Sequence, residues 1–306
     1  MARLPNCFLV GAPKAGTTSL YHYLEQHPQV YMSPIKEPNF FSTEIRIENF
    51  HPALRKRVAR DARSLRKFLS GPMDPKRFGG IVADWEDYLR LFANAGDEMA
   101  LGEASVCYLW SATAAERIAA SIPNARILVM LRNPVDRAFS DYLHGLGAGH
   151  IRWSFREHIQ RNLSHRSSLF CVHYPFLELG LYAAQLSEYL ARFGPNVWVG
   201  FYENFQNRPL ETVQSIFRFL GVSPEFSPDM TRRYLEARVP RTAGRVTPTR
   251  PQPLVRRCFT RRPGSIRMDP ADRDYLVGFY REDIRKLAAL LGRDLEAWLG
   301  QPPGHY

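Results

Sequence analysis

The sequence predicts an α/β fold with three layers, in which helices cover a central parallel sheet and further helices are inserted between its units. The prediction rests on a pattern that occurs three times: a short apolar run, a turn, and a stretch with helical spacing. The apolar runs cover residues 8–10, 127–131 and 197–201. Repeated strand-to-helix units form a parallel sheet, because each helix carries the chain back to the start of the next strand. We find no internal repeat and no low-complexity linker, so we expect a single domain over residues 1–306.

Helical patterns accompany each apolar run. Leu20 and Leu24 follow the first run at helical spacing, and residues 114–121 have a helical pattern just before the second. A helix over residues 134–142 begins at a proline, and a helix over residues 209–220 ends before a glycine. The remaining predicted helices cover residues 50–69, residues 85–93, most of residues 154–193, and, as a pair, residues 269–299.

The composition is that of a folded protein. Hydrophobic residues make up 45% and charged residues 23% of the chain, which excludes a disordered or fibrous protein. No apolar run approaches the roughly 18 to 20 residues of a membrane-spanning helix, so we expect no transmembrane segment. The N-terminus lacks the apolar region and cleavage site of a signal peptide, which predicts a cytoplasmic protein. The four cysteines have no CxxC spacing, so we expect reduced thiols rather than a zinc ribbon or a disulfide scaffold.

The positive charge is concentrated in one segment. The formal net charge is +11, and residues 232–267 alone contain eleven arginines, one glutamate and five prolines. Because the prolines exclude a long helix or a central strand, we expect a loop here. The composition leaves two interpretations open, a solvated arm and a site for a phosphate or an acidic substrate. Nucleic acid is disfavoured as a partner, because the segment has few aromatic residues and the chain has no helix-turn-helix or zinc-finger spacing.

The turn after the first apolar run has the glycine spacing of a phosphate-binding P-loop. In the pattern GxxxxGK[ST], Gly11 and Gly16 take the glycine positions, but Thr17 replaces the lysine and a lysine stands inside the loop at Lys14. A glycine-rich turn lets backbone N–H groups approach a phosphate, and the helix N-terminus that follows favours negative charge. A glycine loop can also serve only strand-to-helix packing. The lysine and the three consecutive hydroxyl residues that begin at Thr17 favour a P-loop-like nucleotide site.

Two segments resemble the nucleotide-binding motifs of one family. Residues 13–20, PKAGTTSL, are similar to the 5′-phosphosulfate loop of the sulfotransferases that use 3′-phosphoadenosine 5′-phosphosulfate (PAPS). Residues 132–140, RNPVDRAFS, are similar to that family's 3′-phosphate motif, in which an arginine and a serine eight residues later hold the extra phosphate. The resemblance is to the glycosaminoglycan-type branch and covers residues 8–222. Shorter similar segments are residues 36–41, residues 102–105 with Tyr108, residues 180–182 and residues 219–222.

The resemblance implies a single sulfotransferase domain that uses PAPS as co-substrate and no metal. It implies two catalytic residues: Lys14, which suits the bridging oxygen of the phosphosulfate, and Glu37, which would take the proton of the acceptor hydroxyl. His22 and His27 are competing candidates for the base. We expect residues 30–32 to form a strand beside the first one and to deliver Glu37 to the sheet edge that carries Lys14. The implied nucleotide-binding residues are Lys14, Ala15, Gly16, Thr17, Thr18, Ser19, Arg132, Ser140, Tyr182, Arg241, Gly244 and Arg245.

The position of Arg132 supports the same site without the resemblance. Arg132 follows the second predicted strand as Lys14 follows the first, so both residues should lie at the carboxyl edge of a parallel sheet, where ligands of α/β proteins bind. Two phosphates on one nucleotide would need two such anchors. Without the first motif, we would interpret Arg132 as a surface arginine and Ser140 as a serine on a helix face, with no role in binding.

Two positions depart from the family pattern, both close to the expected acceptor. Asn39 stands where the glycosaminoglycan-type enzymes commonly have a histidine, and Ala104 where they have a lysine. We therefore expect a hydroxyl-bearing acceptor and leave open whether it is a carbohydrate, a lipid or a small metabolite.

Two alternative functions remain. A P-loop kinase of a small molecule would need a lysine at position 17 and, to hold Mg²⁺, an acidic residue where Arg132 stands. A non-enzymatic polyanion-binding protein would use the arginine-rich loop and would bind with a steep dependence on salt.

Overall fold

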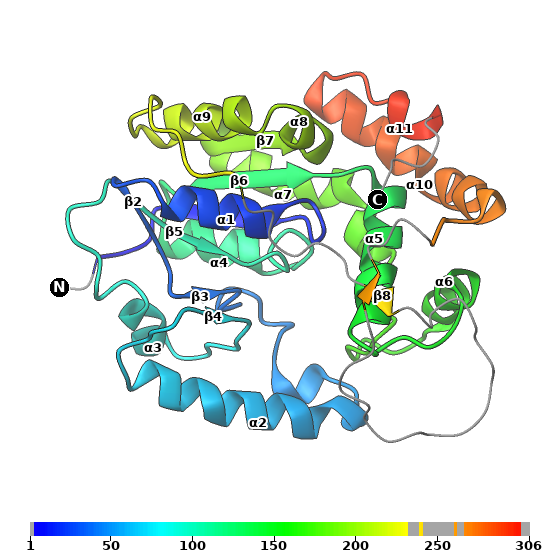
Figure 1. Cartoon of the computed structure of the whole chain (residues 1–306), viewed down its shortest axis with the longest axis horizontal. Coiled ribbons are helices and arrows are strands. Elements are labelled where there is room, and N and C mark those ends of the chain that lie inside the picture. The colour runs from blue at the N-terminus through cyan, green and yellow to red at the C-terminus, as the bar shows by residue number, and fades with distance from the viewer. Residues whose placement is uncertain (1–2, 232–238, 241–259, 262–265, 301–306) are drawn as a thin grey trace. The chain divides into compact units, whose positions relative to one another are not determined.

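The computed structural model describes residues 3–231, 239–240, 260–261 and 266–300 (Figure 1). The chain forms two compact units. The first comprises Met1–Arg132 and Ala184–Leu235, and the second comprises Asn133–Ala183 and Glu236–Tyr306. Most of the arginine-rich segment predicted to be a loop lies outside the described residues.

A parallel sheet forms the centre of the first unit, as the sequence predicted, and it has five strands. Its strand order is β2-β5-β1-β6-β7. Every residue of β1 is buried, and Leu9 of that strand pairs with Ala104 on one side and Leu128 on the other. The continuous apolar runs of β1 and β6 suit strands that are covered on both faces. The strands are β1 (Cys7–Gly11), β2 (Val30–Met32), β5 (Ala100–Ala104), β6 (Arg126–Leu131) and β7 (Val197–Phe201).

Helices cover both faces of this sheet. The connection from β1 to β2 and the connection from β5 to β6 move across the sheet in opposite directions, so right-handed crossovers place α1 and α4 on opposite faces. Figure 1 shows α1 in front of the sheet and α4 behind it. The helix α9 contacts α1. These helices are α1 (Thr17–Glu25), α4 (Ala114–Ser121), α8 (Tyr202–Asn207) and α9 (Pro209–Leu220), joined by the part of α7 (Tyr182–Phe193) from Ala184 onward.

A small second sheet extends the first unit. It pairs β3 (Ile35–Lys36) with β4 (Arg77–Phe78), and residues between these strands form η1 (Ile47–Asn49) and α2 (Pro52–Leu69). The guanidinium of Arg77 donates to Ser64 Oγ of α2 at 3.0 Å, which ties α2 to this sheet. The helix α3 (Trp85–Arg90) follows, and η3 (Gly194–Asn196) precedes β7.

The second unit is mainly helical. Asp283 of α10 accepts hydrogen bonds from the backbone N–H groups of Tyr182, at 2.7 Å, and Ala183, which fixes the start of α7. Arg137 of α5 is fully buried and donates to the carbonyl oxygen of Phe176 at 2.6 Å. The elements are α5 (Pro134–Gly147), α6 (Phe155–Ser164), η2 (Glu178–Gly180), β8 (Val239–Pro240), β9 (Thr260–Arg261), α10 (Pro270–Leu291) and α11 (Ala297–Gly300).

Two predictions about elements need correction. The strand β5, which was not predicted, lies between β1 and β2, so residues 30–32 do not pair with the first strand. The helix predicted to end at Tyr142 continues to Gly147. The segment predicted to be mostly helical, residues 154–193, does contain α6, η2 and α7, and it also has a non-helical loop over residues 165–177. Among the described residues, no helix is both long and apolar enough to cross a membrane.

Candidate functional site

The loop between β1 and α1 has a backbone shaped for close approach by an anion. Lys14 and Gly16 both have left-handed backbone conformations, with φ of 66° and 77°. A Cβ at Gly16 would lie 3.0 Å from the ring of Tyr202, so both the conformation and the space require glycine here. The backbone N–H of Ala12 donates to Met130 O at 2.6 Å, which fixes the loop to β6.

The first turn of α1 has no side-chain cap and so keeps its backbone N–H groups for another partner. The first N–H groups of a helix have no partner within the helix, and they lie at its positive end. Thr17 and Thr18 are buried at this turn, with exposed fractions of 4% and 6%. This arrangement fits a phosphate or sulfate group.

Arg132 lies against this loop. Its side chain is largely buried, and its Nη1 donates to the carbonyl oxygen of Lys14 at 2.9 Å. The guanidinium also stacks over the ring of Tyr202, 4.5 Å from the ring centre. Because β1 and β6 are neighbours, the residues that follow them meet at one edge of the sheet. The structure therefore brings together the arginine and the loop that the sequence placed at this edge.

Five further residues were predicted to bind the nucleotide. Ser140 is on α5 with an exposed fraction of 9%, and Tyr182 is fully buried at the start of α7. Both belong to the second unit. Arg241, Gly244 and Arg245 lie outside the described residues. The roles of these five residues stay predictions.

Glu37 lies at the carboxyl edge of the sheet beside β5, not beside β1 as the sequence predicted. The chain leaves β2 and continues beside β5, where the backbone N–H of Ser33 donates to Gly102 O and that of Glu37 donates to Ala104 O at 2.7 Å. Glu37 thus lies at the end of β5, the strand next to β1. Its carboxylate accepts a hydrogen bond from Lys36 Nζ at 2.8 Å. Lys36 is only 2% exposed and Glu37 is 35% exposed, so a buried ammonium orients an accessible carboxylate.

A buried carboxylate lies behind this segment at Glu103 of β5. Its Oε1 accepts hydrogen bonds from the hydroxyls of Tyr88 and Tyr108 at 2.8 and 2.9 Å, and its Oε2 accepts one from Ser105 at 2.8 Å. The residue has no exposed surface. Burial raises the pKa of Glu103 to about 7, although the three hydrogen bonds oppose the rise.

Two of these hydroxyls also hold the backbone that follows Glu37. Ser105 Oγ accepts from the N–H of Asn39 at 3.1 Å, and the hydroxyl of Tyr108 accepts from the N–H of Phe41 at 3.1 Å. Glu103 therefore fixes the direction of two hydroxyls, and these hydroxyls fix residues 39–41. No role for Glu103 was predicted from the sequence.

Asn39 closes the turn itself. Its Nδ2 donates to the carbonyl oxygens of Glu37, at 2.9 Å, and Gly80, at 2.8 Å. Its Oδ1 accepts from the thiol of Cys107 at 2.9 Å. Glu37 and Asn39 both have positive φ, 68° and 58°, which such a closed turn can hold. The amide of Asn39 thus has a structural use in this chain.

The two competing bases differ in their surroundings. His27 is 1% exposed, and both ring nitrogens are used, one with Ser223 O at 2.9 Å and one with the N–H of Gln29 at 3.0 Å. This structural role excludes His27 as the base. His22 is on α1 and pairs with Glu25 at 3.1 Å.

A metal-ligand group that includes none of the predicted site residues occurs in the described part of the chain. It comprises His165, Cys171 and His173 of the second unit.

Comparison with known proteins places the chain among sulfotransferases. A family model described as "Sulfotransferase family" matches residues 5–228. A crystal structure of a sulfotransferase from Alicyclobacillus acidocaldarius is similar, with 34% identity, a TM-score of 0.72, and coverage of 97% of this chain and 99% of that one.

Two human proteins are similar at 27% identity. One is bifunctional heparan sulfate N-deacetylase/N-sulfotransferase 2, over 99% of this chain and 32% of its own length. The other is carbohydrate sulfotransferase 15, over 96% of this chain and 54% of its own length. The chain therefore spans between a third and about half of the length of these two relatives.

Proposed function

We propose that this chain, which belongs to the sulfotransferase family, transfers a sulfuryl group from PAPS to a hydroxyl of a carbohydrate, a lipid or a small metabolite and releases 3′,5′-ADP. PAPS-dependent sulfuryl transfer is the general reaction of this family. The observation that carries the proposal is the hydrogen bond from Arg132 to the carbonyl oxygen of Lys14. This hydrogen bond places a buried cation, which suits one anionic group of the nucleotide, beside a loop and a helix N-terminus that suit another.

The β1–α1 loop is proposed to hold the phosphosulfate. The backbone of residues 14–16, the first turn of α1 and the hydroxyls of Thr17, Thr18 and Ser19 would bind its oxygens. The ammonium of Lys14 would offset the charge that develops on the bridging oxygen as the bond to sulfur breaks.

Arg132 is proposed to bind the 3′-phosphate together with Ser140. A guanidinium offers two parallel N–H groups to a phosphate, and its burial strengthens the interaction. Tyr182, Arg241, Gly244 and Arg245 are proposed to complete the nucleotide site, as the family resemblance implies.

Glu37 is proposed to act as the general base. Its carboxylate would take the proton of the acceptor hydroxyl while the acceptor oxygen bonds to sulfur and the sulfur–oxygen bond to the nucleotide breaks. The products are a sulfate ester and 3′,5′-ADP, and no metal takes part. Lys36 would hold the carboxylate in a fixed direction, and a base that is held in position takes a proton faster than a mobile one.

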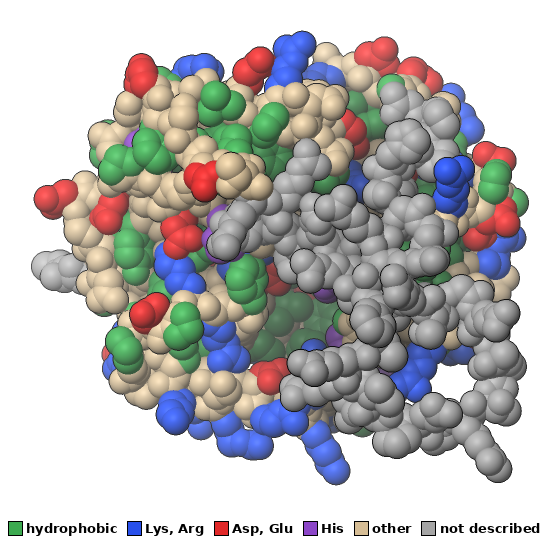
Figure 2. Space-filling view, viewed as in Figure 1, with side chains coloured by type: hydrophobic (Ala, Val, Ile, Leu, Met, Phe, Trp, Pro, Cys, Tyr) green, Lys and Arg blue, Asp and Glu red, His purple; other side chains and the backbone are tan. Residues whose placement is uncertain are grey.

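A carbohydrate with acidic groups is the acceptor that the surface of the first unit favours. The helix α2 carries seven exposed basic residues and one acidic residue, and Figure 2 shows basic side chains along this edge of the molecule. Arg77 lies in β4 and links α2 to the small sheet. The other strand of this sheet, β3, directly precedes Glu37. One human relative is by name a carbohydrate sulfotransferase. The basic residues are Arg55, Lys56, Arg57, Arg60, Arg63, Arg66 and Lys67.

A cytoplasmic location is part of the proposal. Cys7, Cys107 and Cys171 are free thiols in the described part of the chain, which suits a reducing compartment.

Binding of 3′,5′-ADP, ATP and heparin to the purified chain distinguishes the three functions. The proposal expects tight binding of 3′,5′-ADP and release of 3′,5′-ADP from PAPS when an acceptor is present. Preference for ATP would indicate a kinase. Heparin binding with a steep salt dependence and no nucleotide binding would indicate a polyanion-binding protein.

The same assay tests the base. Glu37→Gln keeps the size of the side chain but cannot take a proton, so turnover should fall by roughly 10² to 10⁴ while 3′,5′-ADP affinity is kept. Glu48→Gln, at an exposed glutamate of η1, is the control and should leave turnover unchanged. Near-normal turnover of Glu37→Gln would show that another residue is the base. It would not contradict the proposed nucleotide site.

A further inference from the structure

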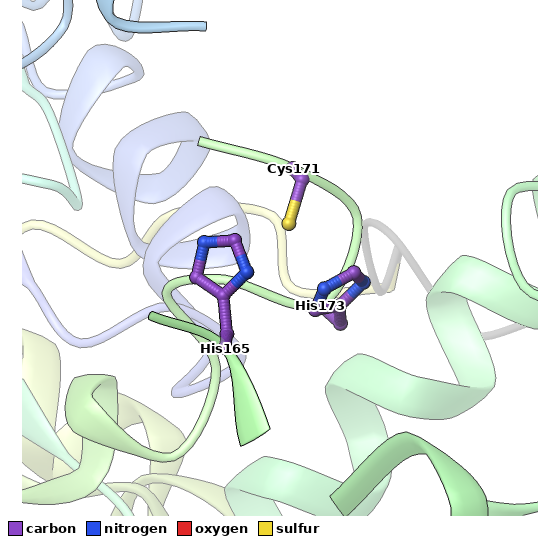
Figure 3. Close-up of side chains that lie close together, drawn as sticks. All are labelled: His165, Cys171 and His173. Carbon is purple, nitrogen blue, oxygen red and sulfur yellow. The ribbon is translucent and has the colours of Figure 1, made fainter. Parts of the chain in front are cut away.

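Three side chains with ligand atoms for soft metals converge in the loop between α6 and η2. The ligand atoms of His165, Cys171 and His173 all lie within 4.8 Å of one another. Figure 3 shows the two imidazoles and the sulfur around a common space, with His165 at the start of this loop and Cys171 and His173 in its middle. All three side chains are partly exposed, so an ion can reach them from solvent.

Asn162 holds the two histidines together. It is buried near the end of α6, with an exposed fraction of 4%. Its carbonyl oxygen accepts from the backbone N–H of His165 at 3.0 Å, and its side-chain amide donates to the carbonyl oxygen of His173 at 2.9 Å. One buried residue thus anchors the backbone of both histidines, although seven residues separate them in the sequence.

A tight turn places the cysteine beside the second histidine. Cys171 and Tyr174 form a two-way backbone bridge, with N–H to carbonyl distances of 2.9 and 3.2 Å. The bridge holds residues 171–174 in a turn, and the Cys171 sulfur lies within 4.8 Å of the ligand atoms of both histidines.

The first imidazole offers an unused nitrogen. Among the described residues, Nε2 of His165 is buried and has no hydrogen-bond partner. A buried polar atom without a partner is costly, and a metal ion would satisfy it.

We propose that His165, Cys171 and His173 form a binding site for a Zn²⁺ ion, with water in the fourth position. Two imidazoles and one thiolate are a ligand set that suits Zn²⁺ better than Mg²⁺ or Ca²⁺. None of the three residues belongs to the proposed nucleotide site or to the acceptor site, so this proposal does not depend on sulfuryl transfer.

The observed spacing suits a site that closes on its ion. With Zn–N of about 2.0 to 2.1 Å and Zn–S of about 2.3 Å, ligand atoms in a tetrahedral site lie about 3.3 to 3.6 Å apart. The largest separation between ligand atoms here is at most 4.8 Å. Side-chain rotations that move these atoms by about 1 Å therefore complete the site. The ion would then cross-link residues 165–173 and stabilise the loop between α6 and η2.

The test titrates the tag-free full chain with Zn²⁺ and measures its metal content after dialysis. We expect one Zn²⁺ per chain, and affinity at least about tenfold weaker in each of His165→Gln, Cys171→Ser and His173→Gln. The control is His150→Gln, at an exposed histidine outside the group, which should bind like the wild type. The melting temperature of the wild type should rise with Zn²⁺, and that of Cys171→Ser should rise less.

Co²⁺ identifies the ligands directly. A tetrahedral Co²⁺ complex of the wild type should show a sulfur-to-metal charge-transfer band, which Cys171→Ser should lose and His150→Gln should keep. This readout holds even if one histidine variant folds poorly. Zn²⁺ retained equally by Cys171→Ser, or no stoichiometric Zn²⁺ in the wild type, would overturn the proposal.

Discussion

Ser105 donates a hydrogen bond to the buried carboxylate of Glu103 at 2.8 Å and accepts one from the backbone of Asn39 at 3.1 Å. The hydroxyl therefore transmits the position of a core carboxylate to the turn that carries Glu37. The N–H of Asn39 can only donate, so Ser105 Oγ accepts from it and keeps its own proton for the hydrogen bond to Glu103.

Removal of this hydroxyl should impair turnover and spare the nucleotide site. In Ser105→Ala, the N–H of Asn39 loses its partner and the turn beside Glu37 loosens, so we expect kcat to fall about tenfold. The affinity for 3′,5′-ADP should not change, since the β1–α1 loop does not use Ser105. Ser111→Ala, at another buried serine whose hydroxyl donates to Glu44 at 2.7 Å, is the matched control. A parallel loss of kcat and of nucleotide affinity would show a general structural defect instead.

Glu103 should make stability depend on pH. Its pKa is raised from 4.5 to about 7 in the folded chain, so the folded state holds this proton more tightly than the unfolded state. The resulting stabilisation is fully present below pH of about 4.5 and is lost as the pH rises to about 7. Between pH 5 and pH 8, the wild type should lose on the order of 2 to 3 kcal/mol relative to Glu103→Gln. Denaturant unfolding of both proteins at the two pH values measures this, and a difference that is constant with pH would contradict it.

Arg132 should decide the preference for a 3′-phosphate. We expect the wild type to bind 3′,5′-ADP more tightly than 5′-AMP, and Arg132→Ala to lose about ten- to a hundred-fold of that preference. Titration calorimetry with both nucleotides measures it. Arg126→Ala is the control, because Arg126 stands at the opposite end of the same strand, β6. Equal affinities of the wild type for the two nucleotides would remove Arg132 from this role.

The repeated strand-to-helix pattern was sufficient to predict the parallel sheet, because β1 and β6 are continuous apolar runs that only a covered sheet accommodates. The strand β5 escaped detection for a physical reason. Its sequence, ALGEA, contains a glycine and a glutamate, and neither is typical of a buried strand. Only the tertiary structure supplies the three hydroxyls that make a buried Glu103 acceptable.

The candidate site, like the sheet, could be predicted only in part from the sequence. Lys14 and Arg132 each follow a recognisable strand, so their meeting follows from the topology alone. The position of Glu37 depends on β5, and the route predicted for it was therefore wrong. The group around Cys171 was missed because its ligands are spaced as HxxxxxCxH, which matches no common zinc motif. The turn at Tyr174 and the anchor at Asn162 bring these ligands together, and neither is visible in the sequence.

The ion pair between Lys36 and Glu37 should matter for turnover more than for folding. Lys36→Met keeps the length and burial of the side chain but removes the ammonium that orients the Glu37 carboxylate. We expect kcat to fall about ten- to a hundred-fold, since small misplacements of a reacting group have effects of this size, while 3′,5′-ADP affinity stays within about twofold. Lys76→Met is the matched control, because Lys76 pairs with Glu25 and not with a residue of the proposed site. Lys36→Arg should restore part of the turnover, as the charge returns to the same place. If Lys36→Met kept full turnover, the carboxylate would be positioned by its backbone alone, through the hydrogen bond from the N–H of Glu37 to Ala104 O.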